Sequence, residues 1–311
     1  MMNKQQLFDH SWTFRELCTW IRTVVKEQGR HKRQFGCMLA GNQAQGMTAI
    51  KHDSRYWNGV AQPFQSKPHY LDDFLGTLKR STHLSLIERW GGVPKEGSVL
   101  KTDLFEEAVG PDTLLGDLAQ QNPRTIGMDV SSVLAQQAAS RDLSLGSSYI
   151  VADCRDLPFV DAAFTLILSP STLDHFLDPA DLGRSLQELK RILAIDGRLI
   201  ITLDNRQNIF DPLLRLLNGF GFTPYYIGRS YRIEELCTEL EAAGFTIEEK
   251  TAILHNPRLV AVALVTLANT LRWPAFTSLV QRSLLAAQRL EHTRWKYFTG
   301  SFIAAKAVRR S

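Results

Sequence analysis

Acidic side chains follow three runs of strand-forming residues in this 311-residue chain. Asp103 follows the run SVLKT, Asp129 follows TIGM, and Asp153 follows SYIVA. If these runs are parallel strands, their carboxyl ends meet at one edge of a sheet, where a carboxylate can accept two hydrogen bonds from a ribose diol. The three positions therefore predict a site for a ligand that carries hydrogen-bond donors.

The turn after the first run has an unusual composition. In a dinucleotide-binding fold this turn is rich in glycine, because bare backbone must approach the ligand closely. Here it contains Phe105, Glu106 and Glu107, and only Gly110 remains before the expected helix at 113–121. Taken alone, the turn is weak evidence for a nucleotide site. Whether the chain binds a nucleotide must therefore be judged from the residues at the ends of the later strands.

Groups that could take a proton lie beyond the fourth expected strand and in later loops. His175, in the segment STLDHF, is the first candidate for a general base, since an imidazole titrates near neutral pH. Tyr226 is the second, and Tyr225 and His255 lie on loops at the same end of the expected sheet. The alternative for His175 is a structural histidine satisfied within its own segment.

The hydrophobic pattern predicts the elements that must position these residues. From Gly97 onward, short β-branched or apolar runs alternate with segments of helical periodicity. Such alternation predicts an α/β fold, a doubly wound, Rossmann-like and mostly parallel sheet with helices on both faces. Strands are expected at 98–104, 124–130, 148–154, 164–169, 198–204, 245–254 and 302–308.

Four parts are expected along the chain. Apolar residues recur at helical spacing in 10–29 and 70–90, whereas 36–67 is rich in Gly, Gln and Pro and is predicted to be irregular. The expected parts are an N-terminal helical cap (1–92), a cofactor-binding core (93–254) with an acceptor-side loop (206–230), a helical insertion (255–297) and a last strand (298–311).

Composition excludes several classes of protein. Apolar residues make up 44% of the chain and charged residues 22%, and the net charge of +4 is too mild to predict binding to nucleic acid. The four cysteines form no CxxC pair, so neither a zinc site nor a disulfide framework is expected. With no signal peptide and no long apolar run, a cytoplasmic location is predicted.

Three later segments resemble motifs of the class I S-adenosylmethionine-dependent methyltransferases. GMDVSS resembles the motif of the second strand, ADCRDLPFVDAAF is similar to the signature after the third, and LQELKRILAIDGRLIIT matches the helix, turn and strand around the fifth. The resemblance covers residues 95–255 and the end of the chain. It implies a seven-stranded sheet with an antiparallel last strand, and S-adenosylmethionine as the cofactor.

The resemblance also implies roles for individual residues. Asp129 would bind the ribose hydroxyls, and Asp153 would accept a hydrogen bond from the adenine amino group, with the Cys154 backbone beside it. Ser169, at the end of the fourth expected strand, is predicted to be a further cofactor contact. The alternative for Asp129 is a cap for the helix that starts near Ser131.

The first turn departs from the family's pattern, an acid followed by three alternating glycines. Gly110 fits the last glycine, but Asp103 stands seven places before it instead of six, which implies one inserted residue. The methionine end of the cofactor carries an ammonium group beside a cationic sulfur, so acidic side chains can compensate for the missing glycines. Asp103 and Glu106 are therefore predicted to contact that end.

The acceptor is expected under two later segments. An antiparallel seventh strand begins at the face where the sixth ends, so 255–297 must lie over the active site, as must 206–230. Within the first, 10 of the 13 residues in LVAVALVTLANTL are apolar. This cover predicts a small, hydrophobic or lipid-like acceptor, or one presented at a membrane surface. Packing on the N-terminal helices or in a homodimer is an equal alternative.

Other functions stay open or are disfavoured. Asp174, Asp204 and Asn205 resemble the ligands of magnesium-dependent methyltransferases, but Asp-Asn is also a common turn pair, and no metal is expected. A catalytically silent binding or scaffold protein is the main alternative, because the first turn is degenerate. An NAD(P)-dependent oxidoreductase lacks its G-x-G-x-x-G here, and methylation of nucleic-acid bases lacks an N-P-P-Y-like motif.

Overall fold

The computed structural model describes residues 54–62, 71–111, 113–142, 147–176, 178–219 and 225–310. All of them belong to one compact unit, residues 50–311. The helix predicted at 10–29 lies outside the described residues. The helix predicted at 70–90 is present as α4 (Asp73–Arg89).

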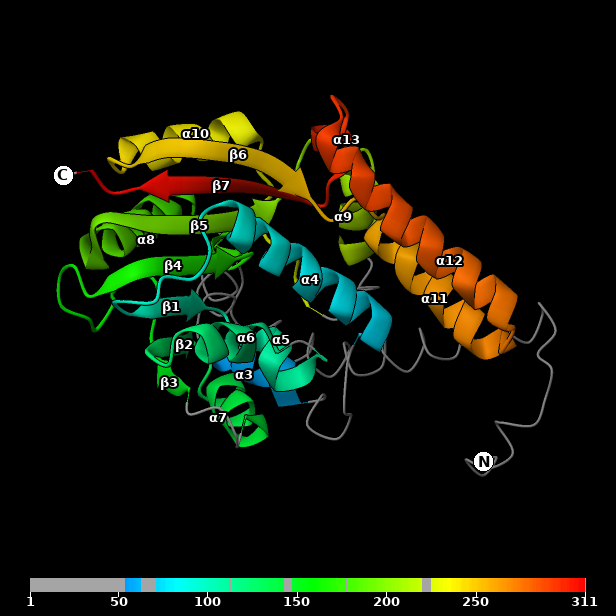
Figure 1. Cartoon of the computed structure of the whole chain (residues 1–311), viewed down its shortest axis with the longest axis horizontal. Coiled ribbons are helices and arrows are strands. Elements are labelled where there is room, and N and C mark those ends of the chain that lie inside the picture. Colours follow the sequence, from blue (N-terminus) through cyan, green and yellow to red (C-terminus); the bar gives the residue numbers. More distant parts are fainter. Residues whose placement is uncertain are drawn as a thin grey trace, which may run out of the picture. The chain divides into compact units, whose positions relative to one another are not determined.

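A seven-stranded sheet forms the centre of this unit (Figure 1). Its order is β3-β2-β1-β4-β5-β7-β6, with the first five parallel to one another and β7 antiparallel to both neighbours. The predicted fold class, including the antiparallel last strand, is confirmed. The strands are β1 (Val99–Thr102), β2 (Thr125–Asp129), β3 (Ser148–Val151), β4 (Phe164–Pro170), β5 (Leu193–Asp204), β6 (Thr246–Ile253) and β7 (Phe302–Val308).

Helices cover both faces of the sheet, because the central strands are apolar on both sides. Leu199 and Leu203 of β5 pack in one core with α8 (Pro179–Ile192) and α10 (Ile233–Ala242). Ile200 belongs to the opposite core with α4, α6 (Leu114–Gln121), α11 (Arg258–Leu271) and α12 (Pro274–Ala287). Two further helices are α7 (Ser132–Arg141) and α13 (Lys296–Thr299).

Helix α8 shows how local sequence sets these elements. Asp178 caps it by accepting a hydrogen bond from Ala180 N at 2.9 Å, and Pro179 opens the first turn, where its missing N–H has no cost. Leu182, Leu186, Leu189 and Ile192 recur at helical spacing and are buried against the sheet. Burial of four such side chains contributes roughly 1.5–3 kcal/mol each.

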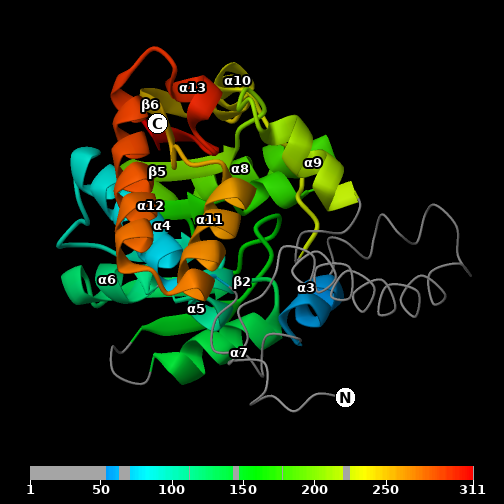
Figure 2. The ribbon, with the colours of Figure 1, turned by 90° about the vertical axis from the view of Figure 1, so that its right-hand side faces the viewer.

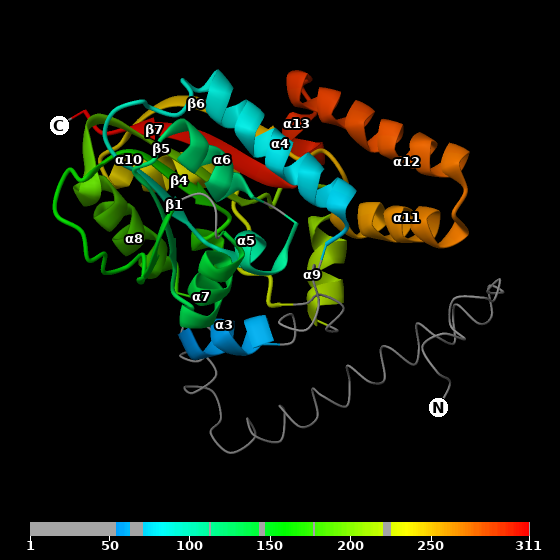
Figure 3. The same cartoon turned by 60° about the horizontal axis from the view of Figure 1, so that its bottom comes forward.

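Three helices were not expected from the sequence. Helix α3 (Ser54–Ala61) falls in the segment predicted to be irregular, so that prediction was wrong for these residues. It lies beside α7 (Figure 3), where its Asn58 accepts hydrogen bonds from Ser131 Oγ and Val133 N. Such tertiary contacts override weak local propensity. The other two are α5 (Phe105–Val109) in the first turn and α9 (Asp211–Gly219) after β5.

Gly228 lies where backbone segments approach most closely. A Cβ built there would be 1.8 Å from the Asp174 carbonyl oxygen and 2.5 Å from His175 Cα, in the 3₁₀ turn Leu173–His175. Gly183, inside α8, would meet nothing within 4 Å.

We expect Gly228→Ala to lower the free energy of unfolding by about 1–3 kcal/mol, because the extra methyl group forces the 3₁₀ turn away. The control Gly183→Ala should raise it by about 1 kcal/mol, since alanine favours an open helix position. Urea unfolding of both variants measures the two effects. Equal stability of Gly228→Ala and wild type would show that the two segments are not packed this closely.

Candidate active site

A cavity of about 270 Å³ lies at the carboxyl ends of β1, β2, β4 and β5. Its walls combine two sets of residues. The strand-end set carries most of the polar groups, and it comprises Asp103, Glu106, Asp129, Asp153, Cys154, Arg155, Ser171, Thr172 and His175. The opposite set is mainly apolar, and it comprises Trp57, Leu71, Leu75, Leu78, Leu214, Tyr225, Ile227, Leu254, Leu259, Val262 and Phe302.

The turn after β1 is held by side chains. Lys101, buried in β1, donates from Nζ to the Asp103 carbonyl at 2.6 Å and to Glu107 Oε2 at 2.9 Å. The other carboxylate oxygen of Glu107 accepts from Leu115 N at the start of α6. A buried lysine and a buried glutamate therefore tie β1, the turn and α6 together.

Asp103 adopts a backbone conformation that normally favours glycine. Its φ of +76° lies in the left-handed region, and its side chain accepts a hydrogen bond from Phe105 N. This glycine-like geometry favours an alignment of the turn that differs from the predicted one. In that alignment Asp103 takes the first glycine position of the family pattern, Lys101 the acid position and Glu107 the last glycine position, and no inserted residue is needed.

Opposite charges surround the cavity end of this turn. Burial raises the pKa of Asp103 to about 7, although Lys101 opposes the shift, and the negative charges of Asp129 and Glu107 add to it. Lys79, from α4, forms an ion pair with Glu106. Burial alone would lower the pKa of Lys79, but the Glu106 carboxylate outweighs it and holds that pKa above its usual range.

Asp129 ends β2 and helps to fix the turn. Its two oxygens accept from Leu104 N and Ser131 N, both at 2.8 Å. It does not cap α7, because Ser131 is the N-cap and accepts from Leu134 N at 3.1 Å. Burial raises the pKa of Asp129 to about 6, against the effect of those two hydrogen bonds. Its side chain lines the cavity with lone pairs to spare.

Asp153 lies beside β3 with an arginine partner. Arg155 donates from Nη2 and Nε to the Asp153 carboxylate at 2.6–3.1 Å, and from Nη1 to Asp181 at 2.9 Å. The same guanidinium lies over the Phe176 ring. Cys154 is buried next to this group, and burial raises the pKa of its thiol well above the usual range.

His175 lies among aromatic rings at the apolar end of the cavity. Its ring centroid is 5.0 Å from that of Trp57 and 5.9 Å from that of Tyr225, both in edge-to-face contact. Phe105 packs against the same two rings. His175 Nδ1 is buried and has no hydrogen-bond partner in the described part of the chain. The His175 side chain lines the cavity, so it stays the candidate for a general base.

Three predicted site residues do not line the cavity. Gly110 ends α5, and a side chain there would collide with Glu106. Ser169 is fully buried and accepts a hydrogen bond from the Thr102 hydroxyl at 3.0 Å. Tyr226 donates its backbone N–H to the Tyr56 hydroxyl. Their proposed contacts with cofactor or acceptor stay predictions. His255 is also turned away, toward Thr299 and the Ala252 carbonyl.

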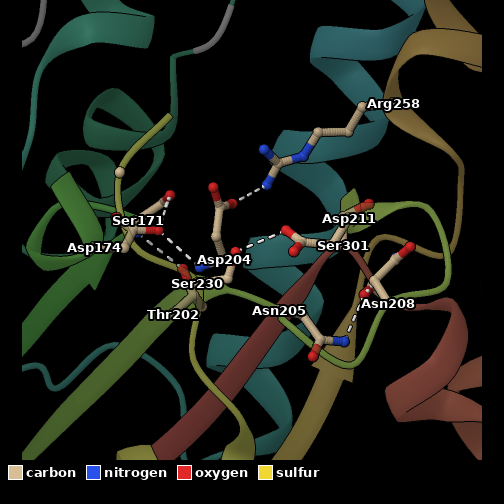
Figure 4. A network of polar contacts seen from close by, with 12 residues as sticks. Ser171, Asp174, Thr202, Asp204, Asn205, Asn208, Asp211, Ser230, Arg258 and Ser301 are labelled. Atoms are coloured by element: carbon tan, nitrogen blue, oxygen red, sulfur yellow. Dashed lines mark hydrogen bonds and ion pairs between the residues drawn. The ribbon is translucent and has the colours of Figure 1, made fainter. Parts of the chain in front are cut away.

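A polar network closes the cavity floor at the end of β5 (Figure 4). Arg258, the first residue of α11, forms an ion pair with Asp204 and lies over the Phe302 ring. Asp174 accepts hydrogen bonds from Ser171 Oγ at 2.8 Å and from Asp204 N at 2.7 Å. Burial, and then the charge of Asp204, raise the pKa of Asp174.

Sequence reasoning missed the cations of this site. Lys79 and Arg258 lie in segments predicted only as helical cover, and their partners come from strand ends far away in the chain. For Arg258 the signal is a lone basic residue at the start of an otherwise apolar helix, whereas Lys79 lies beside Arg80 in a mixed helix and gives no such signal. In the described residues, no group of three or more His, Cys, Asp or Glu side chains is arranged to hold a metal ion.

Residues 106–201 match the family model described as a methyltransferase domain. This match covers less than half of the chain. Over 88 residues it is 35% identical to the chloroplastic tocopherol O-methyltransferase of Arabidopsis thaliana, and over 79 residues 29% identical to a methyltransferase of Encephalitozoon cuniculi. These matches cover 27% and 25% of this chain, but only 24% and 36% of the relatives.

Solved structures of methyltransferases share the fold of this chain. A SAM-dependent methyltransferase from Thermotoga maritima matches 82% of this chain and 97% of its own, with a TM-score of 0.50 and 17% identity. Geranyl diphosphate C-methyltransferase from Streptomyces coelicolor matches 75% and 80%, with a TM-score of 0.52 and 12% identity. The predicted resemblance to class I methyltransferases is confirmed. No helix among the described residues is long and apolar enough to cross a membrane.

We expect Lys101→Met to lower the free energy of unfolding by about 3–5 kcal/mol, because it leaves Glu107 charged and unpaired in the interior. Lys101→Met combined with Glu107→Gln should recover most of the loss, since the glutamine keeps the acceptor for Leu115 N. Chemical unfolding measures both variants. The exposed pair Arg310–Glu248 is the matched control, and Arg310→Ala should cost about 1 kcal/mol or less. Similar costs for Lys101→Met and Arg310→Ala would refute the importance of the buried pair.

Proposed function

We propose that this protein is an S-adenosylmethionine-dependent methyltransferase that acts on a small, apolar acceptor. The observation that carries the proposal is one cavity, within a methyltransferase domain, where Asp129 and Asp153 lie at the ends of neighbouring strands and His175 lies among aromatic rings. The solved structure of geranyl diphosphate C-methyltransferase contains S-adenosylhomocysteine and its diphosphate substrate, which is consistent with this arrangement.

The strand-end residues fit the cofactor by charge and by hydrogen bonding. Asp129 retains lone pairs for the ribose hydroxyls, and Asp153 beside Cys154 can accept from the adenine amino group. Asp103, half-buried at the cavity, offers a carboxylate to the cofactor's ammonium. Glu106 is nearby, but its carboxylate is already paired with Lys79. We therefore assign the ammonium contact first to Asp103.

The acceptor side fits an apolar molecule. Leu75 and Leu78 of α4, Leu214 of α9, and Leu259 and Val262 of α11 line it. The cationic groups there are already neutralised, since Lys79 is paired with Glu106 and Arg258 with Asp204. A charged acceptor would have to compete with these pairs, whereas an apolar one would not.

The bound cofactor supplies a methyl group on a sulfonium, which is an excellent leaving group. The protein's residues orient the acceptor atom in line with that methyl carbon, and such orientation can contribute several kcal/mol, up to about 7–11. An acceptor that takes this methyl group would lose a proton. We assign that proton to Nδ1 of His175, whose ring is held by Trp57 and Tyr225.

A catalytically silent binding protein is the second candidate. It is favoured by the first turn, where Phe105 and Glu107 occupy positions at which the family has glycine, and where a lysine replaces the acid. If those side chains exclude the cofactor, the cavity could still bind an apolar ligand. Binding of the product cofactor separates the two functions.

We expect S-adenosylhomocysteine to bind, and to bind more tightly as pH rises. Its donors need ionised carboxylates, and the pKa values of Asp103 and Asp129 are raised to about 7 and 6. Because the folded carboxyls hold their protons more tightly than the unfolded ones, the free energy of unfolding of the ligand-free protein falls as pH rises from about 4 to 7. Hydrogen bonds from the bound ligand to the ionised carboxylates offset this loss of stability. Isothermal titration at pH 6 and pH 8 should show about a tenfold gain in affinity.

Two variants test the assignment of these carboxylates. Asp129→Asn should weaken binding at least tenfold at pH 8, because it removes a charged acceptor for the ribose. Asp103→Asn should remove most of the pH dependence between 6 and 8. Asp161→Asn, at an exposed carboxylate near the opposite end of β4, is the control and should change neither. Absence of binding by the wild-type protein would leave only the binding-protein candidate.

The proton assignment predicts a specific loss in His175→Ala. With S-adenosylmethionine labelled on its methyl group and a total lipid extract as the acceptor source, wild-type protein should transfer label into solvent-extractable material. His175→Ala should reduce the rate by about 10²–10⁴-fold, the range for loss of a general base. Its affinity for S-adenosylhomocysteine should be unchanged, which distinguishes this loss from unfolding. Undiminished transfer would eliminate His175 as the base.

A further inference from the structure

Helix α11 has an exposed apolar stripe that the fold does not use. Val260, Leu264, Leu267 and Leu271 follow one another at helical spacing and are exposed, whereas the buried side of the helix consists of Ala261, Val265 and Ala268. At the end of the stripe, Trp273 is 61% exposed. A helix that is apolar on its exposed side normally has a partner for that side.

A second exposed group of apolar residues adjoins this stripe. In and before α9, Ile209, Phe210, Leu213 and Leu216 are exposed. Phe210 and Leu213 share a small crevice with Val260 at the base of α11. Figure 2 shows α11 between α12 and α9 in the same view. The two groups together, called here the α9–α11 surface, form a continuous apolar area.

The α11–α12 hairpin carries charge of one sign. No Asp or Glu occurs between Lys250 and Leu290, while Arg272 and Arg282 are exposed on this hairpin. Asp72 accepts a hydrogen bond from Asn269, on the side of α11 opposite the stripe.

Two acidic side chains do line the crevice shared with Val260, but they are buried and paired. Asp211 of α9 forms an ion pair with Arg215, and Asp204 forms one with Arg258. The exposed charges of the hairpin that adjoin the stripe are therefore positive.

The α9–α11 surface borders the cavity. Val262 is 42% exposed and also lines the cavity wall, as do Leu259 of the same helix and Leu214 of α9. An apolar molecule could thus move from the α9–α11 surface to the cavity along apolar side chains. A 14-residue helix is too short to span a bilayer, which needs about 20 residues, so the hairpin can only lie at its surface.

We propose that the α9–α11 surface, with Trp273 at its tip, docks on a membrane that contains anionic lipids. The apolar stripe enters the boundary between headgroups and acyl chains, tryptophan favours that depth, and Arg272 and Arg282 contact lipid phosphates. A second copy of this chain fits less well. A two-fold contact through the same surface would bring the arginines of both copies together without an acidic residue to neutralise them.

Vesicle co-sedimentation of the full chain tests the proposal, and the test needs no methyl transfer. We expect binding to vesicles of phosphatidylcholine mixed with phosphatidylglycerol, much weaker binding to phosphatidylcholine alone, and weakening by salt. Arg272→Glu combined with Arg282→Glu should lower the binding constant about tenfold or more. Leu267→Asp should lower it similarly. Arg184→Glu and Val160→Asp, at exposed positions away from this surface, should leave it unchanged.

Three results would overturn the proposal. They are absence of binding to anionic vesicles, equal binding by the surface variants and the wild type, and a wild-type dimer in solution that Leu267→Asp dissociates. The last would assign the surface to a second copy of the chain. Titration of each variant with S-adenosylhomocysteine, without vesicles, keeps a failure of this proposal separate from a failure of the proposed function.

Discussion

The buried pair between Lys101 and Glu107 is the interaction on which the site depends. In a glycine-rich turn the backbone can adopt a left-handed conformation and approach a ligand at little cost. This chain reaches the left-handed conformation at Asp103 instead, and holds it with a lysine that bonds to the Asp103 carbonyl. The same lysine neutralises Glu107, whose other oxygen anchors α6. A buried charge pair thus does the positioning that glycines do elsewhere.

That substitution explains the distribution of charge around the cavity. Lys101 pairs with Glu107, and within the described ranges neither Asp103 nor Asp129 has an ion pair, so burial raises the pKa of each carboxyl. Other cations that line the cavity are paired, Lys79 with Glu106, Arg258 with Asp204, and Arg155 with Asp153 and Asp181. One end of the cavity therefore favours a positively charged group, and the other end favours an apolar one.

Much of the fold could be predicted from the sequence, because it depends on local periodicity. Alternating strands and amphipathic helices such as 179–192 predicted a doubly wound, mostly parallel sheet with a site at its carboxyl end, and Asp103, Asp129, Asp153 and His175 do line one cavity. The geometry of the first turn could not be predicted, because the φ of Asp103 and the contacts of Lys101 come from packing. The helix at 54–61 was missed for a similar reason, since Asn58 is held by α7.

Topology and composition together predict the proposed acceptor side, and the structure adds which of its side chains line the cavity. Segments that leave β5 and β6 must cross the carboxyl edge of the sheet, so α9 and α11 adjoin the cavity whatever their sequence. Their composition is what varies. An acceptor that arrived from water would need these segments to be polar, because exposed leucines there would bind other proteins or aggregate. In this chain the leucines that line the cavity continue onto the exposed surface, as Leu214 and Leu213 show. Such continuity stabilises an apolar molecule at every point of its path into the cavity, whereas a polar acceptor would gain nothing from it.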